Sequence, residues 1–281
     1  MWTYYKIYYY NNQDKLLNES IFKGLSELSI SDFFFIRYWE GGPHIRLRIR
    51  EKNNTCKINR LFSKIQQYLN DSDSKVNYSE VDYKSISKYL EKIDYDETSM
   101  IRVEDNSIIS SQYIPEIEKY GKNGIAFAEK EFIFSSNLIR IILNKVHSRK
   151  SKIILSSLFQ KKVIATVLRM TEYQSFFRDY QSYWKMYMDL PQQELINKEA
   201  SDIMGIISES NFQETDLFFT KIGLGNFYES IFLELARCEK NIPNTYYLFN
   251  FIHLFNNRLG VSLQDEVLTS LIAQELFDLE R

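Results

Sequence analysis

The pattern of hydrophobic and polar positions changes near residue 125. Before that point, short runs rich in aromatic and β-branched residues alternate with amphipathic stretches, which predicts strands separated by helices. The expected strands cover residues 2–10, 33–38, 45–50, 101–103 and 108–113. The expected helices cover residues 15–28 and 55–69, while residues 78–93 fit a strand and a helix equally well.

After residue 125 the hydrophobic positions recur every three or four residues, which is typical of amphipathic helices. The predicted helices cover residues 126–147, 151–170, 172–186, 193–208, 227–238, 244–258 and 262–279. No internal repeat and no proline-rich linker interrupts this pattern. We therefore expect an α+β fold, with an antiparallel sheet in a strand-rich N-terminal part and a mostly helical C-terminal part. We expect one compact unit, a single domain over residues 1–281.

The strand expected at residues 45–50 has an unusual face. Ile45, Leu47 and Ile49 alternate with Arg46, Arg48 and Arg50, so the apolar and the guanidinium groups point to opposite sides of the sheet. The preceding Gly41-Gly42-Pro43 predicts a turn that pairs this strand with residues 33–38 in a hairpin. A solvated sheet face explains the arginines, and so does a clamp for carboxylate or phosphate, because guanidinium groups bind planar anions in a bidentate manner.

Composition narrows the classes of protein that remain. The 281 residues include 35 Lys and Arg against 37 Asp and Glu, a formal charge of −2, which argues against strong nucleic-acid binding. Cys56 and Cys238 fit no disulfide framework or metal motif. We find no signal peptide and no run of about 18 apolar residues that would form a membrane helix. We expect a cytoplasmic protein that does not enter a membrane.

Several common catalytic motifs do not occur in the sequence. We find no glycine-rich phosphate loop, dinucleotide fingerprint, nucleophile elbow or histidine pair at metal-ligand spacing. The three histidines are His44, His147 and His253. We therefore expect no bound metal and no cofactor.

Three segments, taken in order, resemble the C-terminal domain of lantibiotic dehydratases, most closely its stand-alone versions from thiopeptide-type bacteriocin pathways. Residues 33–48, which contain Gly-Gly-Pro-His-Ile-Arg-Leu-Arg, resemble the first motif of that domain. Residues 113–121 resemble its Tyr-x-x-Glu-x-x-Arg-Tyr-Gly-Gly segment, and residues 251–260 its His-x-x-x-Asn-Arg-x-Gly helix. The matches extend over residues 1 to about 265. Two positions depart from the pattern: Lys119 stands in place of arginine, and Lys122 in place of the second glycine.

The resemblance implies a lyase that removes glutamate from glutamylated Ser or Thr side chains of a ribosomally made precursor peptide, leaving dehydroalanine or dehydrobutyrine. A separate tRNA-dependent enzyme would first attach the glutamate. The implied catalytic residues are Arg46, Arg48, Lys119 and His253, with the arginines binding carboxylates and His253 acting as a general base or acid. We expect the arginines and His253 to meet across a cavity.

The substrate-binding residues that we expect beside these are Glu116, Arg50, His44 and Arg258. Two of them have a plainer explanation as well, because His44 would also simply pack behind its turn and Arg258 would also anchor the late helix. Direct nucleic-acid binding is not expected, and a homodimer is compatible with the sequence.

Two other functions remain open. One is a pyridine synthase that joins two dehydroalanines by a formal [4+2] cycloaddition, since such enzymes resemble the elimination domain. They tend to lose its Arg and His residues, which this chain keeps, so elimination is favoured. The other is a non-catalytic module that binds the precursor peptide, for instance by adding a strand to an open sheet edge.

Overall fold

The structure is a computed structural model that describes residues 2–50, 55–72, 102–207 and 209–279. They fall into two compact units, which are described separately below. Unit 1 contains Met1–Pro115 and Phe132–Lys145, and unit 2 contains Glu116–Glu131 and Val146–Arg281. The segment 78–93, which we could not assign from sequence, lies outside the described residues.

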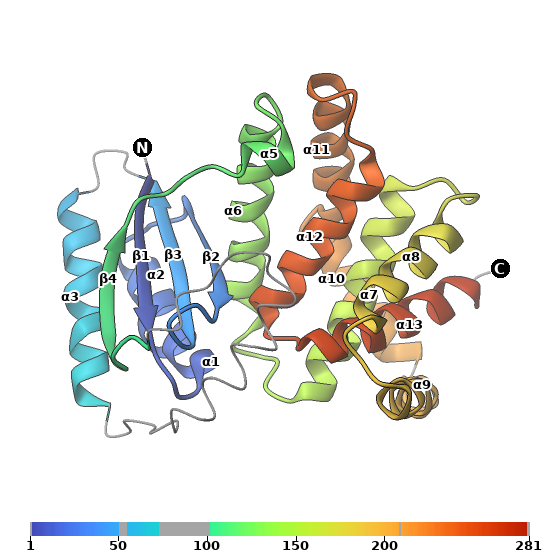
Figure 1. Ribbon diagram of the computed structural model, residues 1–281, viewed down its shortest axis with the longest axis horizontal. Helices are drawn as coiled ribbons and strands as arrows, with labels where there is room; N and C mark the ends of the chain where they lie inside the picture. The colour runs from blue at the N-terminus through green and yellow to red at the C-terminus, as the bar shows by residue number, and fades with distance from the viewer. Residues whose placement is uncertain (1, 51–54, 73–101, 208, 280–281) are drawn as a thin grey trace. The chain divides into compact units, whose positions relative to one another are not determined.

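Unit 1 is built on a four-stranded antiparallel sheet in the order β2-β3-β1-β4 (Figure 1). Helices follow β1 and β3 in the chain, so the described elements have the split β-α-β connectivity of ferredoxin-like folds. The elements are β1 Trp2–Tyr8, α1 Gln13–Lys15, the π-helix η1 Leu16–Phe22, α2 Lys23–Glu27, β2 Phe33–Tyr38, β3 His44–Arg50, α3 Thr55–Asp71 and β4 Ser107–Ser111.

One face of this sheet forms the core of unit 1. Ile45, Leu47 and Ile49 of β3 are fully buried there. Phe22 of η1 packs with its ring 5.5 Å from that of a β2 phenylalanine, and Phe62 of α3 packs 3.8 Å from the ring of Tyr5. The helices thus cover the apolar face, and the alternation in β3 leaves its arginines on the opposite face.

The β2 edge of the sheet is met by α6, Ile125–Ile142, whose second half belongs to unit 1. The backbone N–H of Phe35 donates a hydrogen bond of 3.2 Å to the Ser136 hydroxyl, and Asn137 donates one of 2.9 Å to the Ser31 carbonyl. Such contacts give an edge strand partners that would otherwise be open to another chain.

Unit 2 is helical, with α13 and α7 at its centre. α13 contacts α7, α8 and α9, while α7 also contacts α10, α11 and α12. Its interior is rich in aromatic rings, such as Phe159 and Phe255, which stack 3.6 Å apart. The helices are α5 Ile117–Tyr120, α7 Arg149–Val167, α8 Tyr173–Lys185, α9 Leu190–Met204, α10 Glu209–Lys221, α11 Leu224–Cys238, α12 Asn244–Leu259 and α13 Leu263–Asp278.

The α+β class and the antiparallel sheet are confirmed, whereas several local predictions are wrong. The stretch predicted as one α-helix over 15–28 contains seven residues of π-helix, in which Leu16 and Leu17 are both fully buried. Arg102 and Val103 are not in a strand. The helices α5 and α10 were not predicted. No helix among the described residues is long and apolar enough to cross a lipid bilayer. The single domain over residues 1–281 stays a prediction.

Candidate functional site

Strand pairing gathers positive charge on the side of the sheet in unit 1 that lies opposite its apolar face. Lys6 of β1 pairs with Arg46 of β3, Tyr4 with Arg48 and Trp2 with Arg50. Directly opposed residues of antiparallel strands point to the same face. We call the side chains of Lys6, Arg46, Arg48 and Arg50 the arginine face.

Arg46 is held by an aromatic ring and a carboxylate, and the carboxylate is shared with Lys6. Its guanidinium carbon lies 3.3 Å from the centre of the Tyr38 ring, and Nη2 donates to Glu40 Oε2 at 2.8 Å. Lys6 Nζ donates to the same carboxylate oxygen at 3.0 Å. Burial raises the pKa of Glu40, but the hydrogen bond and charge of Lys6 and the charge of Arg46 outweigh it and place the pKa below its usual value. Glu40 is therefore ionised at neutral pH and orients both cations.

Arg48 lies among aromatic rings. Its guanidinium carbon is 4.5 Å from the ring centre of Tyr4, 5.2 Å from that of Phe34 and 5.6 Å from that of Tyr113. Arg50 lies 4.5 Å from the ring centre of Trp2. Aromatic faces attract cations and fix the plane of a guanidinium group. The rings therefore hold these side chains in place, and Arg48 is itself buried, at 7% exposed.

His44 supports Arg46 from behind the turn. The ring is fully buried, with Nδ1 at 2.8 Å from the Gly42 carbonyl oxygen and Nε2 at 3.3 Å from Arg46 Nε. A carbonyl only accepts and Arg Nε only donates, so Nδ1 carries the proton and Nε2 accepts. Burial lowers the pKa of His44 to about 3, with the charges of Arg46 and Lys6 acting in the same direction. The ring is neutral, and both nitrogens are engaged.

The turn before β3 has a backbone that requires glycine. Gly42 has φ of +125°, and a Cβ there would lie 2.1 Å from the hydroxyl oxygen of Tyr10. The same hydroxyl donates to the Val103 carbonyl at 2.6 Å. Tyr10 thus fixes the turn that carries Glu40 and presents the Gly42 carbonyl to His44.

In unit 2, His253 of α12 is paired with a buried carboxylate. His253 Nδ1 lies 2.6 Å from Glu266 Oε1, and Glu266 is 1% exposed. The Trp184 ring packs 4.8 Å from the imidazole. The His253 side chain is 27% exposed, so this imidazole reaches solvent whereas that of His44 does not. This arrangement suits a residue that exchanges a proton with a substrate.

Glu116 and Lys119 lie at the short helix α5. Lys119 Nζ is 3.6 Å from Glu116 Oε2, and both side chains are exposed enough to meet a ligand, at 34% and 53%. Gly121 follows with φ of +78°, where a Cβ would collide with Glu239. Glu239 Oε1 accepts the backbone N–H of Asn123 at 2.7 Å. The carboxylate of Glu239 thereby holds the loop after α5, which contains Lys122, one of the two departures from the family pattern.

Arg258 is in a different environment from the other predicted residues. It is fully buried, with Nη1 3.8 Å from Glu131 Oε2, and Glu131 accepts the Tyr228 hydroxyl at 2.7 Å. Burial lowers the pKa of Arg258, and the charge of Glu131 opposes that change. These contacts favour the interpretation in which Arg258 anchors α12 inside unit 2.

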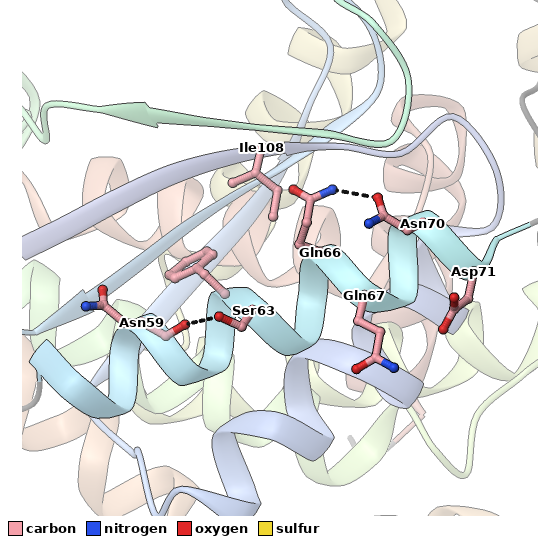
Figure 2. A pocket seen from close by; sticks show the side chains of 8 residues that line it. Asn59, Ser63, Gln66, Gln67, Asn70, Asp71 and Ile108 are labelled. Carbon is pink, nitrogen blue, oxygen red and sulfur yellow. Dashed lines mark hydrogen bonds between the residues drawn. The ribbon is translucent and has the colours of Figure 1, made fainter.

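The described residues offer no metal site. The pocket in unit 1 is not lined by the predicted site residues. Within the described ranges, no group of three or more His, Cys, Asp and Glu side chains could hold a metal ion. A shallow pocket runs along α3 beside Ile108 of β4 (Figure 2). Ile108 pairs with Ile7, so it lies on the face opposite the arginines. The polar side chains there bond locally, as in the 3.0 Å bond from Gln66 to Asn70.

Comparison with known proteins decides the family. The family model described as lantibiotic biosynthesis dehydratase C-term matches residues 2–276. The chain belongs to this family. The match extends across both units, and the recognition made from the sequence motifs is confirmed. No curated protein sequence matches the chain.

Solved structures similar to this family member share its fold at low identity. The pyridine synthase TbtD from thiomuracin biosynthesis is 16% identical, with a TM-score of 0.70 over 99% of this chain and 98% of that one. TsrL is 11% identical, with a TM-score of 0.61 over 99% and 95%. The tRNA dependent lantibiotic dehydratase MibB from Microbispora sp. 107891 is 13% identical, with a TM-score of 0.56 over 100% of this chain but 28% of that one.

The predicted residues divide between the two units. The structure brings His44, Arg46, Arg48 and Arg50 together in unit 1, and it brings Glu116 and Lys119 together in unit 2. Their predicted roles, and the expected meeting of the arginines with His253, stay predictions. Sequence reasoning missed Glu40 and Glu266. Glu40 adjoins the Gly-Gly-Pro-His motif, which was a usable signal, whereas nothing in the sequence connects Glu266 to His253.

Proposed function

We propose that this protein eliminates glutamate from glutamyl esters of Ser or Thr side chains in a ribosomal precursor peptide. A base removes the α-proton of the esterified residue, and that electron pair forms the Cα=Cβ bond. The bond from Cβ to the ester oxygen breaks, and glutamate leaves with its electron pair as a carboxylate. The observation that carries the proposal is the arginine face, a row of cations fixed by aromatic rings on a strand of this family's motif.

The arginine face would bind the glutamyl group. Arg48 and Arg50, oriented by Tyr4 and Trp2, would donate to the carboxylates of the substrate and of the departing glutamate. Negative charge grows on the leaving oxygens in the transition state, so donors fixed in advance lower the barrier. Arg46, which is bound to Glu40, would contribute charge from a fixed position.

His253 would handle the proton, and Lys119 would assist. The imidazole is partly exposed and is positioned by a carboxylate, as a general base requires. Lys119, beside Glu116, would supply a point charge where the family has an arginine. It lacks the bidentate fork of arginine, so we assign it charge stabilisation and not recognition of a planar anion.

The test uses the purified protein and a chemically glutamylated precursor peptide. We expect release of free glutamate and loss of one glutamic acid in peptide mass at each site. Arg48→Gln is expected to lower kcat by about 10²–10³-fold, the usual effect of losing one charge-stabilising donor. Arg60→Gln, at an exposed arginine of α3, is the matched control and should leave kcat unchanged.

Two other results would contradict the proposal. A macrocyclic pyridine product from an already dehydrated peptide, with no glutamate release, would identify a cycloaddition enzyme. Peptide binding without any turnover, unaffected by Arg48→Gln, would indicate a binding module.

A further inference from the structure

A buried carboxylate outside the predicted set, Glu266, lies at the centre of a hydrogen-bond network in unit 2. It occupies the first turn of α13, whose N-cap is Ser262, and is 1% exposed. The N-terminal end of a helix favours negative charge. The two oxygens of a carboxylate accept hydrogen bonds, so Glu266 offers acceptors to the side chains around it.

Three side chains lie within hydrogen-bond distance of the Glu266 carboxylate. The Asn256 amide donates to Oε2 at 3.1 Å, the Tyr180 hydroxyl donates to the same oxygen, and His253 Nδ1 lies 2.6 Å from Oε1. Burial raises the pKa of Tyr180 well above its usual value, and the charge of Glu266 adds to this. Tyr180 therefore stays protonated, and its hydroxyl donates a hydrogen bond to the carboxylate.

The orientation of the Asn256 amide is fixed by a second layer of donors. Gln160 Nε2 donates to the Ser156 hydroxyl at 3.2 Å, and Ser156 donates its own proton to Asn256 Oδ1. The amide nitrogen of Asn256 must then face Glu266. The chain of donors from α7 through α12 to α13 thus has one direction and ends at the carboxylate.

We propose that Glu266 is a positioning residue that fixes His253 in the Nδ1–H tautomer, so that Nε2 is the nitrogen that exchanges the substrate proton. This inference rests on the proposed function, in which His253 acts as the base. When Nε2 takes up the proton, the adjacent carboxylate stabilises the imidazolium that forms. Trp184, packed 4.8 Å from the ring, limits its rotation.

The first experiment reads the tautomer without any substrate. The chain has three histidines, so ¹⁵N spectra of histidine-labelled protein can be assigned with His44→Gln and His147→Asn variants. We expect the signals of His253 to show the Nδ1–H tautomer in the wild type and a mixture of tautomers in Glu266→Gln. An Nε2–H tautomer in the wild type, or an unchanged spectrum in Glu266→Gln, would overturn the inference.

The second experiment separates positioning from a structural role. Glu266→Gln is expected to lower kcat by at least about 10-fold and by no more than the ~10²–10⁴-fold that a general base contributes, with KM unchanged. Glu266→Asp is expected to restore part of the lost kcat. Tyr180→Phe removes a donor to the same carboxylate, so it should lower the melting temperature comparably but keep the His253 tautomer. If Tyr180→Phe lost the Nδ1–H tautomer of His253 as fully as Glu266→Gln, Glu266 would only stabilise the fold.

The two experiments also distinguish this inference from the proposed function. If the wild type releases no glutamate but shows the Nδ1–H tautomer that depends on Glu266, the proposed function fails and the positioning role stands. If glutamate is released and the tautomer does not depend on Glu266, only the inference fails.

Discussion

Two histidines of this chain show how the surroundings of a residue decide what it can do. His44 and His253 both resemble family positions, yet the first has both nitrogens engaged in a buried site and the second reaches solvent. A bonded, buried and neutral imidazole holds other groups in place and is poorly suited to exchange protons. The sequence indicated that both residues belong to family motifs, but it could not separate these roles, because burial depends on the packing of distant segments.

The low pKa of His44 predicts a pH dependence of stability. The unfolded chain takes up a proton near pH 6.5, and the folded ring only near pH 3. The stability that depends on the neutral ring is therefore complete above pH 6.5 and is lost as the pH falls toward 3, at up to about 1.4 kcal/mol per pH unit. Urea unfolding between about pH 7 and pH 5 should show this loss.

His44→Gln is the matched variant for that measurement. Glutamine keeps a donor for the Gly42 carbonyl and an acceptor for Arg46 but does not titrate. Its free energy of unfolding should therefore fall less steeply across the same pH range. Parallel curves for the two proteins would show that the ring is not held neutral by the fold.

At the scale of elements, the sequence predicted the strands and turns that a strong local pattern determines. The alternation in residues 45–50 gave β3 and both its faces, and Gly41-Gly42-Pro43 gave the hairpin with β2. The start of α9 was missed although Asp189 and Gln192 form a capping box there, a recognisable signal. The π-helix η1 has no such signal, because tertiary packing and not the periodicity decides the hydrogen-bond pattern.

Replacing Gly42 tests the element that carries the candidate site. Gly42→Ala places a Cβ 2.1 Å from the Tyr10 hydroxyl at a φ of +125°, so we expect a loss of about 1–3 kcal/mol in the free energy of unfolding. The turn presents Glu40 and the Gly42 carbonyl, so we also expect activity to fall beyond the loss of folded protein. Gly205→Ala, where φ is −62° and the nearest atom is 3.6 Å away, should change stability by less than about 0.5 kcal/mol. Equal effects of the two substitutions would show that the turn tolerates a side chain.

At the scale of the whole molecule, the predicted residues are shared between two units. The arginine face belongs to unit 1, and His253 with Glu266 belongs to unit 2. Local patterns in sequence identify the members of each group, but they cannot show that the two groups act together. The family match over residues 2–276 includes both groups, and the coupling between them can be measured by kinetics.

A kinetic double-mutant cycle measures that coupling. Arg48→Gln and His253→Ala are each expected to lower kcat/KM by about 10²-fold or more. If the two residues serve one elimination step, kcat/KM of the double variant should lie within about 10-fold of that of the less active single variant. Residues that act as a unit have non-additive effects. Independent roles would instead multiply, giving a loss of about 10⁴-fold or more. The control cycle pairs Arg48→Gln with His147→Ala, at an exposed histidine, and should show no loss beyond that of Arg48→Gln. Multiplicative losses in the main cycle would mean that the arginines and the imidazole contribute independently, and they would contradict their action as one catalytic unit.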